Sequence, residues 1–250
     1  MMNTNGSQHR LDSHARRLRQ LALRAGLELG AGLAALPWLR LAPRGDGHAV
    51  LVLPGLGAGD HSTRLLRGFL RDRGYTAKGW GLGRNLGPRA GFERGMLDAL
   101  DRMGDESGRT VSLVGWSLGG LYARDLAAKR PEAVRSVITL GSPLHHPRLT
   151  ERPLPMAPTT SIYSRSDEIV PWQCSVEPES ARSENIEVMG SHLGLGFNPT
   201  VLFAIGDRLA QAEGQWQPFE RSGWRQFVYP DPRREDTSTR VASDGAPFAA

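Results

Sequence analysis

A serine near the middle of the chain stands in a setting that suits nucleophilic catalysis. Ser117 is the central residue of the pentapeptide GWSLG at 115–119, between a β-rich run at 110–114 and a helical stretch at 118–130. Small flanking residues allow a serine to sit on a strained strand-to-helix turn that lifts its hydroxyl above a sheet. Because so short a pattern also arises by chance, its position at a strand-to-helix junction carries the prediction.

Two later residues could activate this serine. A serine hydroxyl is a weak nucleophile until a base takes its proton, and that base is usually a histidine oriented by a carboxylate. Asp167 follows the run 160–164, and His192 follows the run 185–189, so the carboxylate precedes the histidine along the chain. We therefore expect Ser117 to be the nucleophile, Asp167 the acid and His192 the base.

Other acidic residues and histidines suit these roles less well. Glu168 adjoins Asp167 and is expected to point elsewhere, and Asp125 falls within the helix that follows the serine. His145 and His146 follow a Gly-Ser-Pro turn and are interpreted as loop residues. Without acidic or cysteine companions such a pair is a weak metal site, so neither a metal nor a cofactor is predicted.

A glycine-rich loop after the run 49–53 could complete the site. It reads PGLGAGD at 54–60. An oxyanion hole needs two backbone N–H groups, one from the residue after the nucleophile and one from the loop after the first major strand. We expect Leu118 and Leu56 to supply them. A dinucleotide-binding loop is disfavoured, because Asp60 stands where a third glycine belongs and no acidic residue ends the next strand.

The elements that must position these residues alternate between strands and helices. Ligands of open parallel sheets bind beyond the carboxyl ends of the strands, where the candidate residues lie. The alternation predicts an α/β fold, an open and mostly parallel sheet with helices on both faces. The strand candidates are 49–53, 75–80, 110–114, 134–140, 160–164 and 185–189, and the helix candidates are 61–73, 90–103, 118–130 and 198–212.

We divide the chain into three segments. Residues 1–45 form an amino-terminal amphipathic helical arm, 46–224 the main α/β domain, and 225–250 a polar and flexible tail. A chain of 250 residues does not require a second large domain.

The amino-terminal arm is predicted from its apolar residues. They recur at helical spacing from Leu18 to Leu36, and Pro37 is expected to end that helix. Arg24 and Glu28 interrupt the apolar run, which argues against a transmembrane helix. The helix is expected to pack on the main domain, and a peripheral contact with a membrane surface stays open as an alternative.

Composition excludes several classes of protein. With 39% hydrophobic and 23% charged residues, the chain resembles ordinary soluble globular proteins. The excess of 31 basic over 26 acidic residues is scattered along the chain, so no nucleic-acid partner is predicted. The single cysteine, Cys174, excludes an intramolecular disulfide and favours a reducing compartment, hence a cytoplasmic location.

Taken together, the GWSLG turn, the Asp167 and His192 loops and the PGLG loop resemble the α/β-hydrolase superfamily over residues 48–212. With its small number of predicted strands and its Leu-Gly-Ser-Pro turn at 140–143, the chain resembles small bacterial lipases or esterases. The resemblance implies the same nucleophile, acid, base and oxyanion donors. Pro54 departs from the family, in which a histidine often precedes the glycine. The interval 142–161 is a proline-rich loop, so no large cap domain is expected.

These residues predict a serine hydrolase that cleaves carboxylic esters with an apolar acyl group through an acyl-enzyme, as esterases and lipases do. The partner would be a small-molecule ester or a lipid-like substrate. An acyltransferase, an amidase or a non-catalytic binding protein of the same fold are the alternatives. The residues expected to offer apolar surface to the substrate are Trp80, Trp116, Leu144, Trp172 and Leu193.

Overall fold

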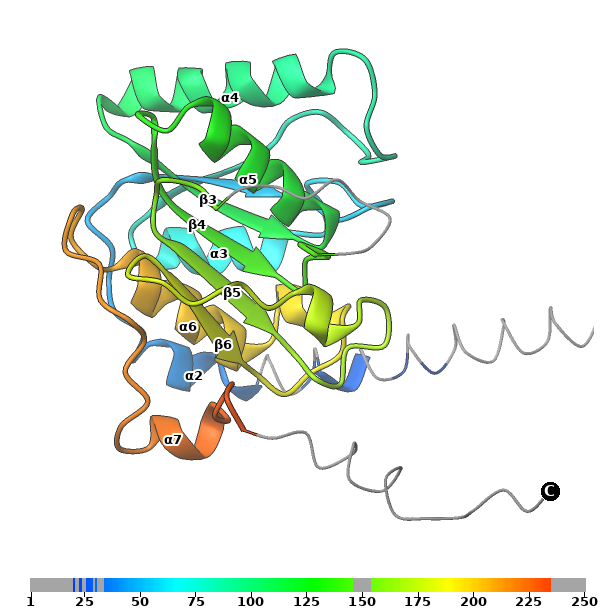
Figure 1. Ribbon diagram of the computed structural model, residues 1–250, viewed down its shortest axis with the longest axis vertical. Helices are drawn as coiled ribbons and strands as arrows, with labels where there is room; N and C mark the ends of the chain where they lie inside the picture. The colour runs from blue at the N-terminus through cyan, green and yellow to red at the C-terminus, as the bar shows by residue number, and fades with distance from the viewer. Residues whose placement is uncertain are drawn as a thin grey trace, which may run out of the picture.

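The computed structural model describes residues 34–145 and 154–234, together with residues 20, 23, 26–28 and 30. Six parallel strands form one sheet in the order β2-β1-β3-β4-β5-β6 (Figure 1). The predicted fold class is confirmed, and each predicted strand overlaps an observed one. The strands are β1 (Ala49–Leu53), β2 (Thr76–Gly79), β3 (Val111–Trp116), β4 (Val134–Leu140), β5 (Thr159–Tyr163) and β6 (Ser183–Glu187).

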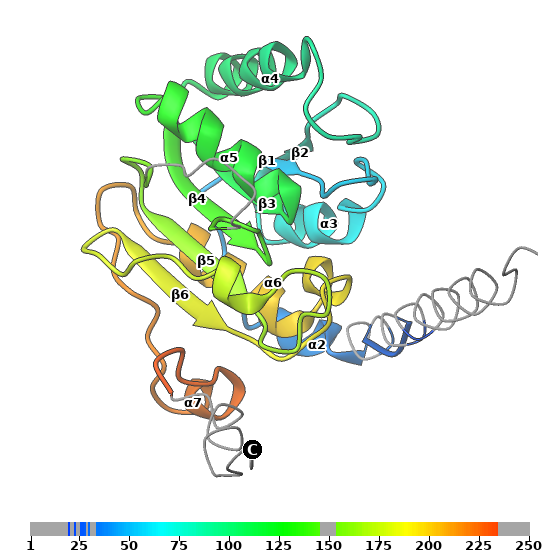
Figure 2. The same ribbon diagram turned by 45° about the vertical axis from the view of Figure 1, so that its right-hand side comes forward.

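Helices cover both faces of the sheet, because alternate strand residues point to opposite faces and both sets are apolar. In β1, Val50 and Val52 join one core cluster, whereas Leu51 and Leu53 join the other. Figure 2 shows the two helical layers on either side of the strands. The first cluster includes residues of α2 (Leu36–Leu39), α3 (Arg64–Asp72) and α6 (Pro199–Leu209), and the second includes residues of α4 (Phe92–Ser107) and α5 (Leu118–Lys129).

The strand order reverses direction between β1 and β3. The chain passes from β1 outward to β2, then returns to β3 on the other side of β1 and continues to β6. Ligand crevices form at such a reversal, outside the carboxyl ends of the strands. Leu53 and Gly115 are register partners at those ends. The loop after β1 and the turn after β3 therefore emerge side by side.

The amino-terminal boundary differs from the sequence-based expectation. Each described residue between 20 and 30 is helical, but most of the predicted apolar stripe from Leu18 to Leu36 lies outside the described residues. Pro37 does not end a helix there. It stands in the first turn of α2, where the N–H that proline lacks would have no helical partner.

The tail predicted from 225 begins too early. The helix α7 (Arg225–Val228) precedes Tyr229, which is fully buried and donates its hydroxyl to the carbonyl oxygen of Thr200 at 2.8 Å. The rings of Tyr229 and Phe219 meet edge to face at 4.8 Å between centroids. This packing attaches Tyr229 to the domain, and the ion pair of Arg234 with Glu187 of β6 attaches the segment up to residue 234. The remainder of the predicted tail, 235–250, lies outside the described residues.

The connection before His192 is longer than expected. β6 ends at Glu187, so four residues separate the strand from the histidine, which is followed by the short 3₁₀ helix η2 (Gly194–Gly196). A second 3₁₀ turn, η1 (Trp172–Cys174), lies between β5 and β6. Among the described residues, every helix is too short or too polar to cross a bilayer.

Candidate active site

The turn between β3 and α5 places Ser117 in a strained conformation. Its backbone has φ 54° and ψ −121°, and no other described non-glycine residue has a positive φ. Such conformations cost about 1–3 kcal/mol and persist only where surrounding contacts impose them. Here the N–H of Ser117 donates to the carbonyl oxygen of Leu140 at 2.8 Å, which anchors the turn to the end of β4.

Close backbone packing explains the small residues of the pentapeptide. A Cβ on Gly115 would lie 2.3 Å from the carbonyl oxygen of Gly119, and one on Gly119 would lie 2.3 Å from the carbonyl oxygen of Leu53. Neither backbone neighbour can move aside cheaply. Strand, turn and helix therefore approach one another only because these two positions lack side chains.

The loop after β1 lies directly against this turn. A Cβ on Gly55 would be 3.2 Å from the Cβ of Ser117. Asn85 fixes the loop with two hydrogen bonds. Its side-chain amide donates to the carbonyl oxygen of Pro54 at 2.9 Å, and its backbone carbonyl oxygen accepts the N–H of Gly57 at 2.5 Å. Gly57 has φ 76°, which favours glycine.

Two backbone donors remain open at this junction. Within residues 34–145 and 154–234, neither the N–H of Leu56 nor that of Leu118 donates to a protein acceptor. Leu118 is the first residue of α5, so its N–H has no intrahelical partner. These are the two donors predicted for an oxyanion hole, and that role stays a prediction.

Asp60 ties the same loop to the end of β2. Its two carboxylate oxygens accept the N–H groups of Trp80 and Gly81, each at 3.0 Å. A Cβ on Gly79 would fall 2.2 Å from the Asp60 carboxylate. The residue that breaks the dinucleotide-binding pattern thus braces the loop after β1.

Asp167 and His192 form a buried hydrogen-bonded pair. Nδ1 of His192 lies 2.6 Å from Oδ2 of Asp167, and both side chains are almost fully buried. The other oxygen of Asp167 accepts the N–H groups of Ile169 and Val170, each at 2.8 Å. Three donors thus orient the carboxylate, and its bond to Nδ1 leaves Nε2 of the imidazole as the nitrogen that can accept a proton.

Gly141 links this pair to the serine turn. A Cβ on Gly141 would lie 3.0 Å from Oδ2 of Asp167 and 3.3 Å from Nδ1 of His192. Its neighbour Leu140 accepts the N–H of Ser117, so all three predicted residues surround one strand end. The hydrogen bonds of the described residues do not include one between the Ser117 hydroxyl and the imidazole. In structures without substrate such catalytic bonds are often long.

The rival residues have other surroundings. His145 pairs with Glu177 at 3.5 Å, and Glu177 also accepts a buried hydrogen bond from Arg124 at 2.8 Å. Burial raises the pKa of the Glu177 carboxyl, while Arg124 and His145 oppose that rise. His146 lies outside the described residues. Among those described, no group of three or more histidine, cysteine or acidic side chains is placed to hold a metal ion.

The residues predicted to touch substrate fall into two groups. Trp80, Trp116 and Leu144 are buried, at 1%, 8% and 1% exposure, so their side chains belong to the packed interior and offer little surface to a ligand. The Trp80 ring packs there against Phe92 and Tyr122, and its indole N–H donates to the carbonyl oxygen of Gly83 at 2.9 Å. Trp172 is half-buried and stacks on Tyr163, and Leu193 is exposed.

Two exposed apolar residues near the acid and base were missed by the sequence analysis. Ile169 lies two positions after Asp167, and Met189 lies three positions before His192. Their nearness in the sequence to the predicted acid and base was the available signal. Glu28 was also missed, because it served only as an interruption of an apolar run, yet its carboxylate accepts two hydrogen bonds from Ser191.

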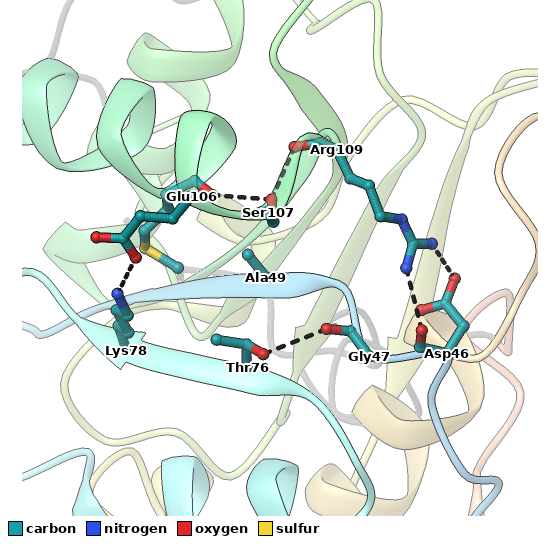
Figure 3. Close-up of a pocket in the computed structure, with 9 residues that line it drawn as sticks. Asp46, Gly47, Ala49, Thr76, Lys78, Glu106, Ser107 and Arg109 are labelled. Carbon is teal, nitrogen blue, oxygen red and sulfur yellow. Dashed lines mark hydrogen bonds and ion pairs between the residues drawn. The ribbon is translucent and has the colours of Figure 1, made fainter.

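A cavity at the opposite edge of the sheet has a different character. It measures about 350 Å³ and lies beside the starts of β1 and β2 (Figure 3). Its charged groups pair with one another, Lys78 with Glu106 and Arg109 with Asp46. None of the residues predicted for catalysis lines it.

The fold of the chain is that of the α/β hydrolases. A structure from the metagenome-derived lipolytic enzymes LipS and LipT superposes with a TM-score of 0.52 at 17% identity, over 67% of this chain and 94% of the other. A putative hydrolase of the α/β superfamily from Xanthomonas campestris pv. campestris gives a TM-score of 0.53 at 20% identity, over 65% and 97%. These likenesses establish the fold.

Two curated relatives match part of the chain in sequence. The chain is 37% identical over 108 residues to the serine hydrolase BPHL of Mus musculus, and 36% identical over the same length to that of Homo sapiens. Each match covers 39% of this chain and 37% of the relative, so it spans little more than a third of those proteins. No family model matches the chain.

Proposed function

We propose that the protein is a serine hydrolase of carboxylic esters whose acyl group is apolar. The observation that carries the proposal is the buried His192–Asp167 hydrogen bond of 2.6 Å, which adjoins the strand end that anchors the strained Ser117. A nucleophile, a base and an orienting acid are what acyl transfer requires.

In the first half of the proposed reaction, the Ser117 hydroxyl oxygen forms a bond to the ester carbonyl carbon while Nε2 of His192 takes the hydroxyl proton. The carbonyl oxygen becomes an oxyanion that accepts the N–H groups of Leu56 and Leu118. The tetrahedral intermediate then collapses, the bond to the alcohol oxygen breaks, and the imidazolium gives its proton to the departing alcohol. Asp167 stabilises the imidazolium throughout.

In the second half, water repeats the same steps on the acyl-enzyme. His192 removes a proton from the water as its oxygen attacks the acyl carbon, and the proton passes to Ser117 as the carboxylic acid leaves. The hydroxyl and imidazole are expected to close to hydrogen-bond distance when substrate binds. Each N–H donor to the oxyanion would contribute about 3–4 kcal/mol of transition-state stabilisation.

Apolar residues around the predicted site support an apolar acyl group. Leu56, Ile169, Met189 and Leu193 are exposed, and they come from the loops that follow β1, β5 and β6. Exposed apolar side chains gathered from separate loops at one edge suit a hydrocarbon chain better than a charged metabolite.

Replacing Ser117 by alanine tests the proposal. Hydrolysis of p-nitrophenyl esters is expected to fall by about 10³-fold or more, because the nucleophile is lost. Ser107, at the end of α4 near the opposite edge, offers the control, and its alanine variant should keep the parent rate. Turnover unchanged in Ser117→Ala would reject the proposal. Product analysis with added alcohols or amines separates hydrolysis from acyl transfer and from amidase activity.

The amino-terminal helix supports a peripheral contact with lipid as a further part of the proposal. Leu23 and Leu27 lie one helical turn apart and are 70% and 78% exposed. Serine at both positions should weaken flotation of the full chain with liposomes, whereas serine at Leu65, an exposed leucine of α3, should not.

The single cysteine supports the cytoplasmic location that we keep as part of the proposal.

A further inference from the structure

The loop that bears His192 is fixed from three directions. The imidazole is bonded to Asp167, and the carbonyl oxygen of His192 accepts the indole N–H of Trp116 at 3.2 Å. The residue before the histidine, Ser191, is bonded to Glu28. The first two partners belong to the loop after β5 and to the end of β3, whereas Glu28 comes from the amino-terminal helix, 163 positions away in the sequence.

Both oxygens of the Glu28 carboxylate are used in this contact. Oε1 accepts the backbone N–H of Ser191 at 2.8 Å, and Oε2 accepts the Ser191 hydroxyl at 2.6 Å. Ser191 is fully buried when Glu28 is in place. Hydrogen bonds to a charged acceptor are about twice as strong as those between neutral groups.

The same serine shapes the turn that carries the histidine. Its hydroxyl oxygen accepts the N–H of Gly194 at 3.1 Å, and its carbonyl oxygen accepts the N–H groups of Gly194 and Leu195. A Cβ on Gly194 would lie 1.6 Å from Oε2 of Glu28, so the carboxylate packs directly on this turn. His192 therefore lies between Ser191, which is bonded to Glu28, and Gly194, against which the Glu28 carboxylate packs.

We propose that Glu28 is a positioning residue for His192, so that the amino-terminal helix is part of the machinery that orients the base. This inference rests on the proposed function. Removal of the carboxylate leaves a buried N–H and a buried hydroxyl without their acceptor, and the turn must rearrange to satisfy them. A shift of about 1 Å in a catalytic group can cost about 10²-fold in rate.

Three variants of the full chain test the role. Glu28→Ala is expected to lower kcat for p-nitrophenyl esters by about 10- to 100-fold, with KM changed less than about twofold, because substrate binding is untouched. Glu28→Gln should recover part of the rate, since its amide oxygen can accept the Ser191 N–H while its NH₂ donates to the hydroxyl. Glu106→Gln removes an exposed carboxylate at the opposite edge and should leave both constants unchanged.

Hydrogen–deuterium exchange gives a readout that does not depend on activity. Exchange in the peptide that covers residues 188–197 should accelerate in Glu28→Ala, stay closer to the parent rate in Glu28→Gln, and be unchanged in Glu106→Gln. The strands should keep their protection. Faster exchange across the whole domain, or equal rates for the alanine and glutamine variants, would assign Glu28 a merely structural role and overturn the inference.

The experiment separates this inference from the proposed function. If the parent protein neither hydrolyses esters nor reacts at Ser117 with a fluorophosphonate, the proposed function fails, and the positioning role of Glu28 in catalysis fails with it even if exchange shows that it orders the loop. If the parent is active and Glu28→Ala retains the parent kcat and exchange rates, only the role of Glu28 is overturned.

Discussion

Polar groups differ in how far they are satisfied at the two ends of the parallel strands. We call the side of the sheet at which the strands end the carboxyl edge, and the side at which they begin the amino edge. At the carboxyl edge, Ser117 is held in a strained conformation, and the nearby N–H groups of Leu56 and Leu118 have no acceptor within the described residues. At the amino edge, Asp46 accepts hydrogen bonds from His48, Arg109 and Arg135. A strained residue beside unsatisfied donors marks a candidate reaction site, whereas charges that already satisfy one another mark a structural contact.

The pKa values of Asp46 and His48 are both shifted at the amino edge. Partial burial opposes ionisation of Asp46, but hydrogen bonds from His48, Arg135 and Arg109 hold the pKa of its carboxyl well below the ordinary range. Burial lowers the pKa of His48, even though its hydrogen bond to Asp46 acts in the other direction. The imidazole of His48 lies between Asp46 and Ser112, whose hydroxyl oxygen is 2.9 Å from its Nε2.

The largest expected difference between the two edges is the effect on kcat of replacing Asp167 or Asp46. Asp167→Asn should lower kcat for ester hydrolysis by about 10⁴-fold, because the imidazole loses the acceptor that fixes its tautomer. Asp46→Asn should leave the kcat of the folded protein unchanged while lowering its stability. Steady-state kinetics and urea unfolding of both variants provide the measurement. A large loss of kcat in Asp46→Asn would remove the distinction between the edges.

A smaller effect is expected at the backbone donor of Leu56. Proline at this position lacks the N–H, so kcat should fall by about 10²–10³-fold. Leu56→Ala keeps the N–H and trims only an exposed side chain, so it should retain most of the rate. Thermal melting shows whether the proline variant is folded. Equal kinetics for a folded proline variant and the alanine variant would exclude this N–H from the oxyanion hole.

The smallest expected effect is on acid stability at the amino edge. Because the pKa of His48 is lowered in the folded protein, the unfolded chain binds the extra proton first, and stability falls as pH drops below about 6.5. The slope from one such group is at most about 1.4 kcal/mol per pH unit. His48→Gln should show a shallower fall between pH 7.5 and 5.5 in urea unfolding. Identical slopes would contradict the assignment.

Local sequence patterns sufficed to predict the fold and the pairing of two polar residues that follow strands. Apolar runs such as 134–140 become strands buried on both faces, because parallel sheets need little in-out alternation. The fold class is therefore confirmed, and Asp167 and His192, chosen by their places after strands, are hydrogen-bonded. Their roles with Ser117 stay predictions.

Features that depend on long-range packing could not be predicted from local patterns. Trp80 was expected to face a ligand, but its ring is buried against Phe92 and Tyr122, which lie 12 and 42 positions later in the sequence. Tyr229 lies in a polar stretch that gave no sign of its burial against α6. The Glu28–Ser191 contact joins the amino-terminal helix to the loop after β6, and no sequence pattern around either residue predicts it.

The central claim is that the reactive nucleophile lies at the carboxyl edge of the sheet. It is tested most directly by treating the full chain with a fluorophosphonate and mapping the modified peptide by mass spectrometry. We predict one stoichiometric adduct, on Ser117, and none in Ser117→Ala. An unmodified Ser117, or equal labelling of the alanine variant, would contradict the account.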